Sequence, residues 1–220
     1  MTTFRKFWEN RARTDFYEYF NDFTNTGDYA AADWTITTTE AGAGDATEAI
    51  STGAAGGVLV VTNDAGAADA DYLQNKIECF RFTSGKAAEF EIRFKISDVT
   101  NTAFVAGLQI TDTTPLAVTD GVFIRKGEDD TYPDLVVCKN STETVVAAPD
   151  PLVNDTWVKL GFYYDGTDTM QFFVNDQRVA ACAVTNLPDD EDLAISFGLL
   201  NSSAAAHVLS VDYIRAISER

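Results

Sequence analysis

The sequence predicts an all-β protein, an antiparallel two-sheet sandwich of the jelly-roll type. Four segments alternate apolar and polar residues with a period of two, the pattern of a strand that buries one face. They span 90–96, 158–164, 170–174 and 193–199. Turn sequences separate the strand-like segments at spacings of about 8–15 residues, as in a meandering antiparallel fold.

Further strand-like segments extend from residue 16 nearly to the end of the chain. Taken in order, they span 16–23, 34–39, 58–61, 72–82, 87–97, 136–138, 158–164, 170–174, 193–199 and 208–217. Residues 40–56 are mostly small and are expected to form a loop. Asp165-Gly166, between two alternating segments, predicts a tight β-hairpin. The alternation predicts one shared core that contains Phe90, Ile92, Phe94, Phe162, Phe172 and Phe197.

The length and composition indicate one large β domain over residues 16–220, preceded by a short arm over residues 1–15. With 220 residues, 45% of them hydrophobic, the chain can bury a substantial core. The three cysteines are an odd number and are widely spaced, so a disulfide framework is not expected. Cys79 and Cys138 are interpreted as small buried residues inside strands.

The net charge of −18 argues against two classes of partner. Nucleic acid and anionic membrane surfaces both attract clustered Lys and Arg, which this chain lacks outside the arm. The first residues contain no apolar stretch of the kind found in signal peptides. No apolar run approaches the length of a membrane span. We therefore expect a protein that is made in a reducing cytoplasm.

The arm differs in charge from the rest of the chain. Within residues 4–13, four basic residues accompany one acid, Glu9, and the aromatic residues recur at helical spacing. One interpretation is a lid that packs on its own domain. The other is a partner-binding arm with aromatic anchors, whose candidate residues are Phe4, Arg5, Lys6, Phe7, Trp8, Arg11 and Arg13.

The segment from Trp157 to Val179 resembles a hairpin of the concanavalin A-like, laminin-G-like jelly-roll domains. Its first strand opens with Trp157 and ends in the turn Tyr164-Asp165-Gly166, and its partner strand closes with Val179. The final segment 208–217 looks like the last strand of that family, which usually pairs with the first. The resemblance spans residues 16–218 and implies the fold. It implies little about activity, because this scaffold hosts lectins, glycosidases and structural modules.

Laminarinase-type members of that family carry carboxylates at alternating positions of one strand. Here Glu89 and Glu91 share a face, but Arg93 occupies the third position. An adjacent cation lowers the pKa of a carboxyl group, which is unfavourable for a general acid at neutral pH. We therefore expect cross-strand charge pairs on a solvated face, and a protein that is not an enzyme. The single histidine, His207, supports neither a catalytic triad nor a zinc site of usual composition.

No cofactor is expected. Ca²⁺ is the one metal for which the sequence offers candidate ligands. Glu128–Asp130 and Asp189–Asp192 are acidic loops with the oxygen ligands that Ca²⁺ prefers. Neither loop has the alternating ligand spacing of a known calcium motif. Solvated acidic turns are the simpler interpretation.

An acidic jelly roll with a basic, aromatic arm is similar to accessory structural proteins of tailed-bacteriophage virions. That resemblance implies a non-enzymatic capsid decoration, or cement, protein that is made in the host cytoplasm and resides on the virion. It also implies binding to the major capsid protein or other virion subunits, and a homo-oligomer, expected as a trimer. The alternative is a lectin-like module that recognises cell-surface polysaccharide, with Trp34 and Tyr132 as candidate aromatic platforms. Trp34 opens a strand-like segment and is equally compatible with the core.

Overall fold

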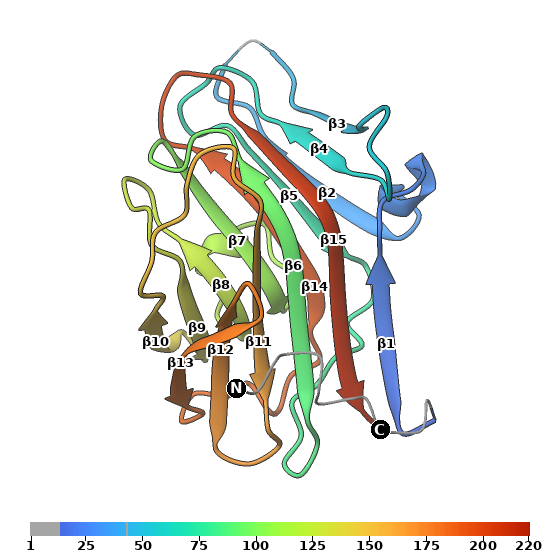
Figure 1. Cartoon of the computed structure of the whole chain (residues 1–220), viewed down its shortest axis with the longest axis vertical. Helices are drawn as coiled ribbons and strands as arrows, with labels where there is room; N and C mark the ends of the chain where they lie inside the picture. The colour runs from blue at the N-terminus through green and yellow to red at the C-terminus, as the bar shows by residue number, and fades with distance from the viewer. Residues whose placement is uncertain (1–13, 43) are drawn as a thin grey trace.

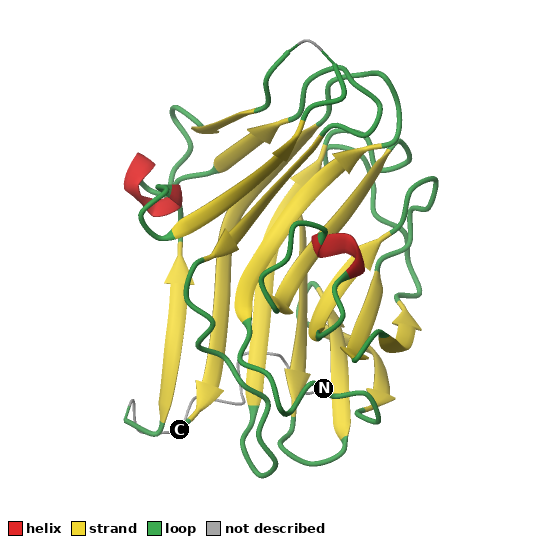
Figure 2. Cartoon of the chain, turned by 180° about the vertical axis from the view of Figure 1, so that it is seen from behind, coloured by secondary structure: helices red, strands yellow, loops and turns green. Residues whose placement is uncertain are grey.

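The computed structural model describes residues 14–42 and 44–220. Two antiparallel sheets face each other and form a β-sandwich (Figures 1 and 2). The helical content of the described residues consists of two 3-10 turns, η2 (Thr26–Tyr29) and η3 (Pro115–Ala117). The predicted all-β jelly-roll sandwich is confirmed. In the described part of the chain, no helix is long and apolar enough to cross a membrane.

Sheet A contains the long central strands β6 and β15, which run side by side in Figure 1. Its strand order is β13 (Gln177–Ala183), β12 (Thr169–Val174), β11 (Val158–Tyr164), β6 (Ala88–Ile96), β15 (Val208–Glu219), β4 (Leu59–Thr62) and β3 (Thr47–Ile50). β1 (Phe16–Asn21) also pairs with β15. The predicted pairing of the first strand with the last is therefore confirmed.

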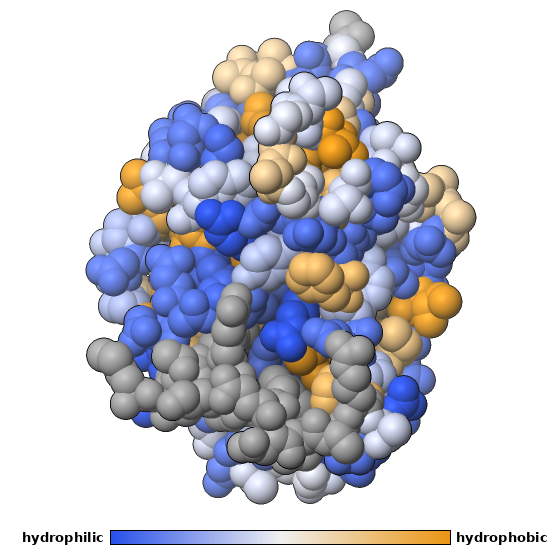
Figure 3. Space-filling model, turned by 45° about the vertical axis from the view of Figure 1, so that its right-hand side comes forward, coloured by the Kyte–Doolittle hydropathy of each residue, from blue (hydrophilic) through white to orange (hydrophobic). Residues whose placement is uncertain are grey.

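Sheet B forms the second layer. Its strand order is β10 (Thr142–Ala147), β9 (Asp134–Lys139), β8 (Gly121–Lys126), β7 (Thr102–Gln109), β14 (Ala194–Asn201), β5 (Ala70–Asn75) and β2 (Trp34–Thr39). The loop that carries η3 packs against β7 and β14. Figure 3 shows hydrophilic residues over much of the visible surface, with apolar residues in separate patches. This distribution fits a sandwich whose apolar rows face inward.

The core lies between the sheets and has the predicted register. All six predicted core residues are fully buried: Phe90, Ile92, Phe94, Phe162, Phe172 and Phe197. Phe90 stacks on Phe162 of the neighbouring strand, with ring centroids 5.4 Å apart. The predicted hairpin joins β11 to β12, and Gly166 adopts φ +84° in its turn. Glycine has no Cβ and so accepts this left-handed backbone without strain.

Three local predictions were wrong. The segment 72–82 is not one strand, because β5 ends at Asn75 and only an isolated bridge joins Phe80 to Leu193. Cys79 lies in this irregular stretch and is exposed, whereas Cys138 is buried in β9 as predicted. The expected loop 40–56 contains the short strand β3, which forms because it pairs with β4.

Gly198 sits where two strands approach closely, which gives a test of the packing of sheet B. It pairs with Tyr72 of β5 and Val105 of β7. A Cβ at this position would lie 2.3 Å from the carbonyl oxygen of Asp71. We expect Gly198→Ala to lower the free energy of unfolding by about 1–3 kcal/mol, because backbone must shift to admit the methyl group.

Urea denaturation measures this loss, and Gly127→Ala is its matched control. A Cβ on Gly127 meets nothing within 4 Å, so that variant should stay within about 0.5 kcal/mol of the parent. Equal stabilities of the two variants would show that the strands can separate at Gly198 without cost.

Candidate functional site

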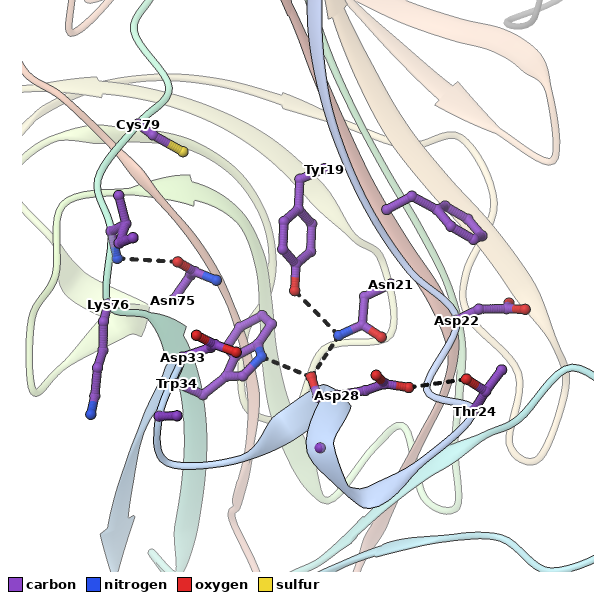
Figure 4. Close-up of a pocket in the computed structure, with 14 residues that line it drawn as sticks. Tyr19, Asn21, Asp22, Thr24, Asp28, Asp33, Trp34, Asn75, Lys76 and Cys79 are labelled. Carbon is purple, nitrogen blue, oxygen red and sulfur yellow. Dashed lines mark hydrogen bonds between the residues drawn. The ribbon is translucent and has the colours of Figure 1, made fainter.

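A pocket of about 580 Å³ opens at one rim of the sandwich, where β1 ends and β2 begins. The stretch after β1, the 3-10 turn η2, the start of β2 and the segment that follows β5 all contribute to it (Figure 4). Its wall is both polar and aromatic. A concave site with several converging polar groups is the usual form of a small-molecule binding site.

Trp34 and Asn21 fix the inner wall of the pocket by binding one backbone oxygen. The Trp34 indole Nε1 donates to the carbonyl oxygen of Asp28 at 2.9 Å, and Asn21 Nδ2 donates to the same oxygen at 2.6 Å. Asn21 Nδ2 also donates to the Tyr19 hydroxyl at 3.2 Å. These bonds, drawn in Figure 4, hold η2 against β1 and β2. The wall is therefore preorganised.

The carboxylate of Asp28 accepts hydrogen bonds from residues at the start of η2. The Asn25 side chain accepts a hydrogen bond from Gly27 N at 2.8 Å, and Asp28 Oδ2 accepts from Asn25 N at 3.0 Å. This reciprocal arrangement is a capping box. Thr24 Oγ1 adds a further bond to Asp28 Oδ2 at 3.3 Å. Asp28 is consequently oriented by its own turn.

Two other residues of the lining, Asp22 and Asp33, carry carboxylates. Among the described residues, the side chains of Asp22 and Asp33 have neither a hydrogen bond nor an ion pair. Partial burial, together with the charges of Asp212 and Asp28, raises the pKa of Asp22. The ammonium group of Lys76 donates to the backbone oxygen of Ala31. In Figure 4 the Asp22 carboxylate points away from Asn21 and Trp34, whereas Asp33 lies beside Trp34, so the pocket presents the carboxylate of Asp33 as its free acceptor.

Aromatic rings form the other part of the wall. Phe20 is 54% exposed, and its ring centroid lies 5.9 Å from that of Tyr213. Tyr19 meets Trp34 edge to face, with ring centroids 6.3 Å apart. Burial raises the pKa of the Tyr19 phenol. The hydrogen bond with Asn21 lowers this pKa, and the nearby charge of Asp33 raises it. Tyr19 is therefore a neutral hydrogen-bonding group at neutral pH.

The sequence predictions for aromatic platforms met different outcomes. Trp34 is 1% exposed and belongs to the core, so it is not a surface platform. Tyr132 is 43% exposed, but it does not line the pocket. Phe20 was missed, although the period of two in β1 points Tyr17 and Tyr19 toward the core and Phe20 away from it.

The predicted partner-binding residues of the arm are Phe4, Arg5, Lys6, Phe7, Trp8, Arg11 and Arg13, and all of them lie outside the described residues. The interpretation of the arm as a lid or as a partner-binding segment stays a prediction. The same holds for the homotrimer.

Glu89 and Glu91 do lie on one face of β6, and cross-strand charge pairs surround them. Arg215 Nη1 lies 3.3 Å from Glu89 Oε1, and Lys159 Nζ lies 3.7 Å from Glu91 Oε2. The Tyr213 hydroxyl also donates to Glu91. The prediction of a solvated face was wrong at these two positions. Glu89 is 1% exposed and Glu91 is 4% exposed, so both carboxylates are buried.

Both acidic loops are exposed to solvent, as predicted, and in one of them surface cations pair with the carboxylates. Lys139 Nζ lies 2.5 Å from Asp189 Oδ1 and 2.9 Å from Asp190 Oδ1. Arg81 Nε lies 3.1 Å from Asp192 Oδ1. In the other loop, Asp130 Oδ1 accepts from the backbone N–H of Thr131 and Tyr132. Within the described residues, no group of three or more His, Cys, Asp or Glu side chains could hold a metal ion.

No protein-family model matches the chain. No curated protein sequence matches it either. Solved structures with the same fold include an endo-1,3-beta-glucanase from Streptomyces sioyaensis, with a TM-score of 0.64 and 12% identity over 95% of this chain and 98% of the glucanase. A protein of unknown function from Shewanella oneidensis has a TM-score of 0.64 and 16% identity, over 93% of this chain and 87% of that chain. The metal-free Emp46p carbohydrate recognition domain has a TM-score of 0.60 and 11% identity, over 89% of this chain and 93% of that chain.

These similarities correct the prediction that the chain is not an enzyme. The glucanase and an endo-beta-1,4-glucuronan lyase from Trichoderma reesei are enzymes with this fold. At identities of 12% in both cases, they show the fold alone. The prediction failed because the argument from Arg93 concerned one strand only. Enzymes with this fold can place catalytic residues on other strands and loops.

The same group of structures bears on metal binding. The Emp46p carbohydrate recognition domain has also been solved in a potassium-bound form. A protein with this fold can therefore bind a metal ion, as the Emp46p domain does. Together, the solved structures establish a concanavalin A-like jelly-roll fold for this chain.

Proposed function

We propose that the protein is a carbohydrate-binding module that holds its sugar in the rim pocket. The observation that carries this proposal is the exposed ring of Phe20 in the lining that also contains Asn75 and the unpaired carboxylate of Asp33. The fold is shared with a carbohydrate recognition domain and a glucanase, which supports the same class of ligand.

A sugar ring matches the two kinds of surface in this pocket. Its C–H face is apolar and can lie against an aromatic ring such as Phe20. Its hydroxyl groups donate hydrogen bonds, which the carboxylate of Asp33 can accept, and bonds to carboxylates are stronger than bonds between neutral groups. Asn75, also in the lining, offers an amide that both donates and accepts.

Replacing Phe20 with Ala tests the aromatic contribution. A glycan array first identifies the sugar that the full chain binds, and calorimetry then measures its affinity. We expect Phe20→Ala to weaken binding about tenfold, since an aromatic contact is worth roughly 1 kcal/mol or somewhat more. Tyr132→Ala removes another exposed ring outside the pocket and should leave the affinity unchanged. Equal effects of the two substitutions, or an array without any bound glycan, would contradict the proposal.

The role in a phage virion stays a prediction. It depends on the arm residues, which lie outside the described part of the chain. A sugar-binding pocket is compatible with that role, because a virion protein can also bind polysaccharide at the surface of a cell. The localisation on a virion and the capsid partner are accordingly kept as predictions.

A further inference from the structure

We propose that the outer face of sheet A, the side that points away from sheet B, is a docking surface for residues 1–13 of the same chain. This surface is distinct from the rim pocket, and the inference does not depend on the carbohydrate-binding function. It follows from the burial of side chains on this face, from the place where residues 1–13 join the domain, and from the charges of both surfaces.

The described strands and 3-10 turns form no second layer over this face. Every described strand belongs to sheet A or sheet B, η2 lies at the rim, and η3 packs against β7 and β14 of sheet B. Figure 1 looks onto sheet A, with β6 and β15 in front of sheet B. Side chains that point outward from such a sheet are expected to meet water. Phe20 of β1 does so, since it is 54% exposed.

One end of the outer face is nevertheless buried. An apolar cluster lies there, separate from the core, and no member is more than 9% exposed: Ala87, Tyr163, Phe173 and Ile217. Phe16, at the start of β1, packs against this outer cluster. Glu89 and Glu91, which point to the same side of β6, are buried as well. A segment outside the two sheets must cover this end, because large apolar patches are rarely left in water.

Residues 1–13 join the domain beside the outer cluster. The backbone N–H of Arg220 donates to the carbonyl oxygen of Asp15 at 2.9 Å, and Phe16 pairs with Glu219. The backbone N–H of Glu219 donates in turn to the carbonyl oxygen of Ala87 at 3.0 Å. Crossing the face from β1 over β15, β6 and β11 to β12 takes four strand spacings, about 19 Å. Thirteen extended residues span up to about 43 Å, which is enough to cover the cluster.

The charges of the two surfaces are opposite. Within residues 4–13, four basic residues accompany one acid, which gives a net charge of +3. The ion-pair network at the buried end of the face joins four carboxylates to two cations: Glu18, Glu89, Glu91 and Asp176 with Arg215 and Lys159. The network therefore keeps an excess of negative charge, which attracts a basic segment.

Glu91 offers this segment a specific contact. Its Oε1 accepts from the Tyr213 hydroxyl, whereas its buried Oε2 has no hydrogen-bond partner among the described residues. Lys159 Nζ lies 3.7 Å from Oε2, beyond hydrogen-bond distance, and donates to Asp176. A buried carboxylate oxygen is stabilised when a cationic donor reaches it, and the Arg and Lys side chains of residues 1–13 are such donors. Their aromatic neighbours supply apolar surface to cover Phe173.

A photo-crosslinking residue in the full chain tests this contact. Trp8→p-benzoylphenylalanine is made both with and without an isotope label, and the two preparations are mixed before irradiation. Mass spectrometry of the peptides locates the crosslinks. We expect crosslinks to β6, β11 or β12 within single chains, and none between labelled and unlabelled chains. Tyr132→p-benzoylphenylalanine, in the loop between β8 and β9 of sheet B, should give no crosslink to those strands.

Substitutions on the face, each combined with the crosslinker at Trp8, show which side chains hold the segment. Phe173→Ala should lower the yield of these crosslinks at least about twofold, since it removes an aromatic contact. Phe20→Ala removes the same ring from an exposed position on the same face and should leave the yield unchanged. Glu91→Gln keeps the shape of the side chain but removes its charge, and should also lower the yield. Thermal unfolding checks that each variant is folded, and Glu91→Gln decides the test where Phe173→Ala does not fold.

Four results would overturn the inference. Crosslinks between labelled and unlabelled chains would mean that residues 1–13 bind another copy of the chain. Crosslinks confined to sheet B, or no crosslinks, would place the segment elsewhere. Equal yields from Phe20→Ala and from the substitutions at Phe173 and Glu91 would mean that the outer cluster and its charge do not hold the segment.

Discussion

Replacing Phe94 with Ala is expected to lower the free energy of unfolding by about 3–5 kcal/mol. Phe94 is fully buried at the centre of β6. Its ring stacks on that of Phe104 from β7 in the opposite sheet, with centroids 4.2 Å apart and an interplanar angle of 17°. Truncation to Ala removes apolar surface from the core and leaves a cavity that the two rigid sheets cannot close.

Phe20 provides a matched control for this substitution. Phe20→Ala makes the same chemical change on the same sheet, at a side chain that is 54% exposed. Urea denaturation of both variants should show a loss at Phe20 of no more than about 1 kcal/mol. Similar losses at the two positions would mean that the inter-sheet contact between Phe94 and Phe104 does not determine stability.

The central strands could be predicted because each buries one face. β6, β11 and β12 alternate apolar and polar residues, and the alternation alone indicates which side faces the core. β3 could not be predicted this way. It is a four-residue edge strand, and its conformation comes from pairing with β4 rather than from a pattern of its own. The end of β5 was misjudged because apolar residues continue into an irregular segment.

Only part of the candidate pocket could be predicted from the sequence. Alternation in β1 is sufficient to point Phe20 outward, as the structure shows. Asp33 and Asn75 line the same pocket because β2 pairs with β5, which places Trp34 opposite Asn75. No local pattern in the sequence indicates that pairing. The sequence left Trp34 open between a surface platform and the core. Its indole donates to a backbone oxygen in η2, so the ring can be buried.

We expect the buried carboxyl group of Asp71 to make the protein less stable as the pH rises toward 7. It lies on the face of β5 that carries Leu73 into the core, and it is fully buried. Neither carboxylate oxygen has a partner at hydrogen-bond geometry among the described residues. Burial raises the pKa of Asp71 to about 7, and the neighbouring carboxylates of Glu48 and Glu40 act in the same direction, while Thr38 opposes them.

The sign of the effect follows from the direction of this shift. The pKa of Asp71 is higher in the folded protein than in the unfolded chain, so the folded state holds a proton that the unfolded state has lost. Its contribution is fully present below the ordinary aspartate pKa of 3.8 and is lost as the pH rises toward about 7. A difference of about 3 pKa units corresponds to a loss of about 4 kcal/mol across that window.

Asp71→Asn should remove this dependence, because Asn has a similar shape and does not ionise. Urea denaturation of parent and variant between pH 4 and pH 8 measures the difference in stability at each pH. That difference should shift in favour of the variant by as much as about 4 kcal/mol as the pH rises to 7, and then become constant. Titrating groups that do not interact with Asp71 cancel in the difference. Asp150→Asn, at an exposed position, should show no such trend. A difference for Asp71→Asn that stays constant from pH 4 to pH 8 would mean that Asp71 is ionised in the folded protein throughout, and that water or a cation reaches its carboxylate.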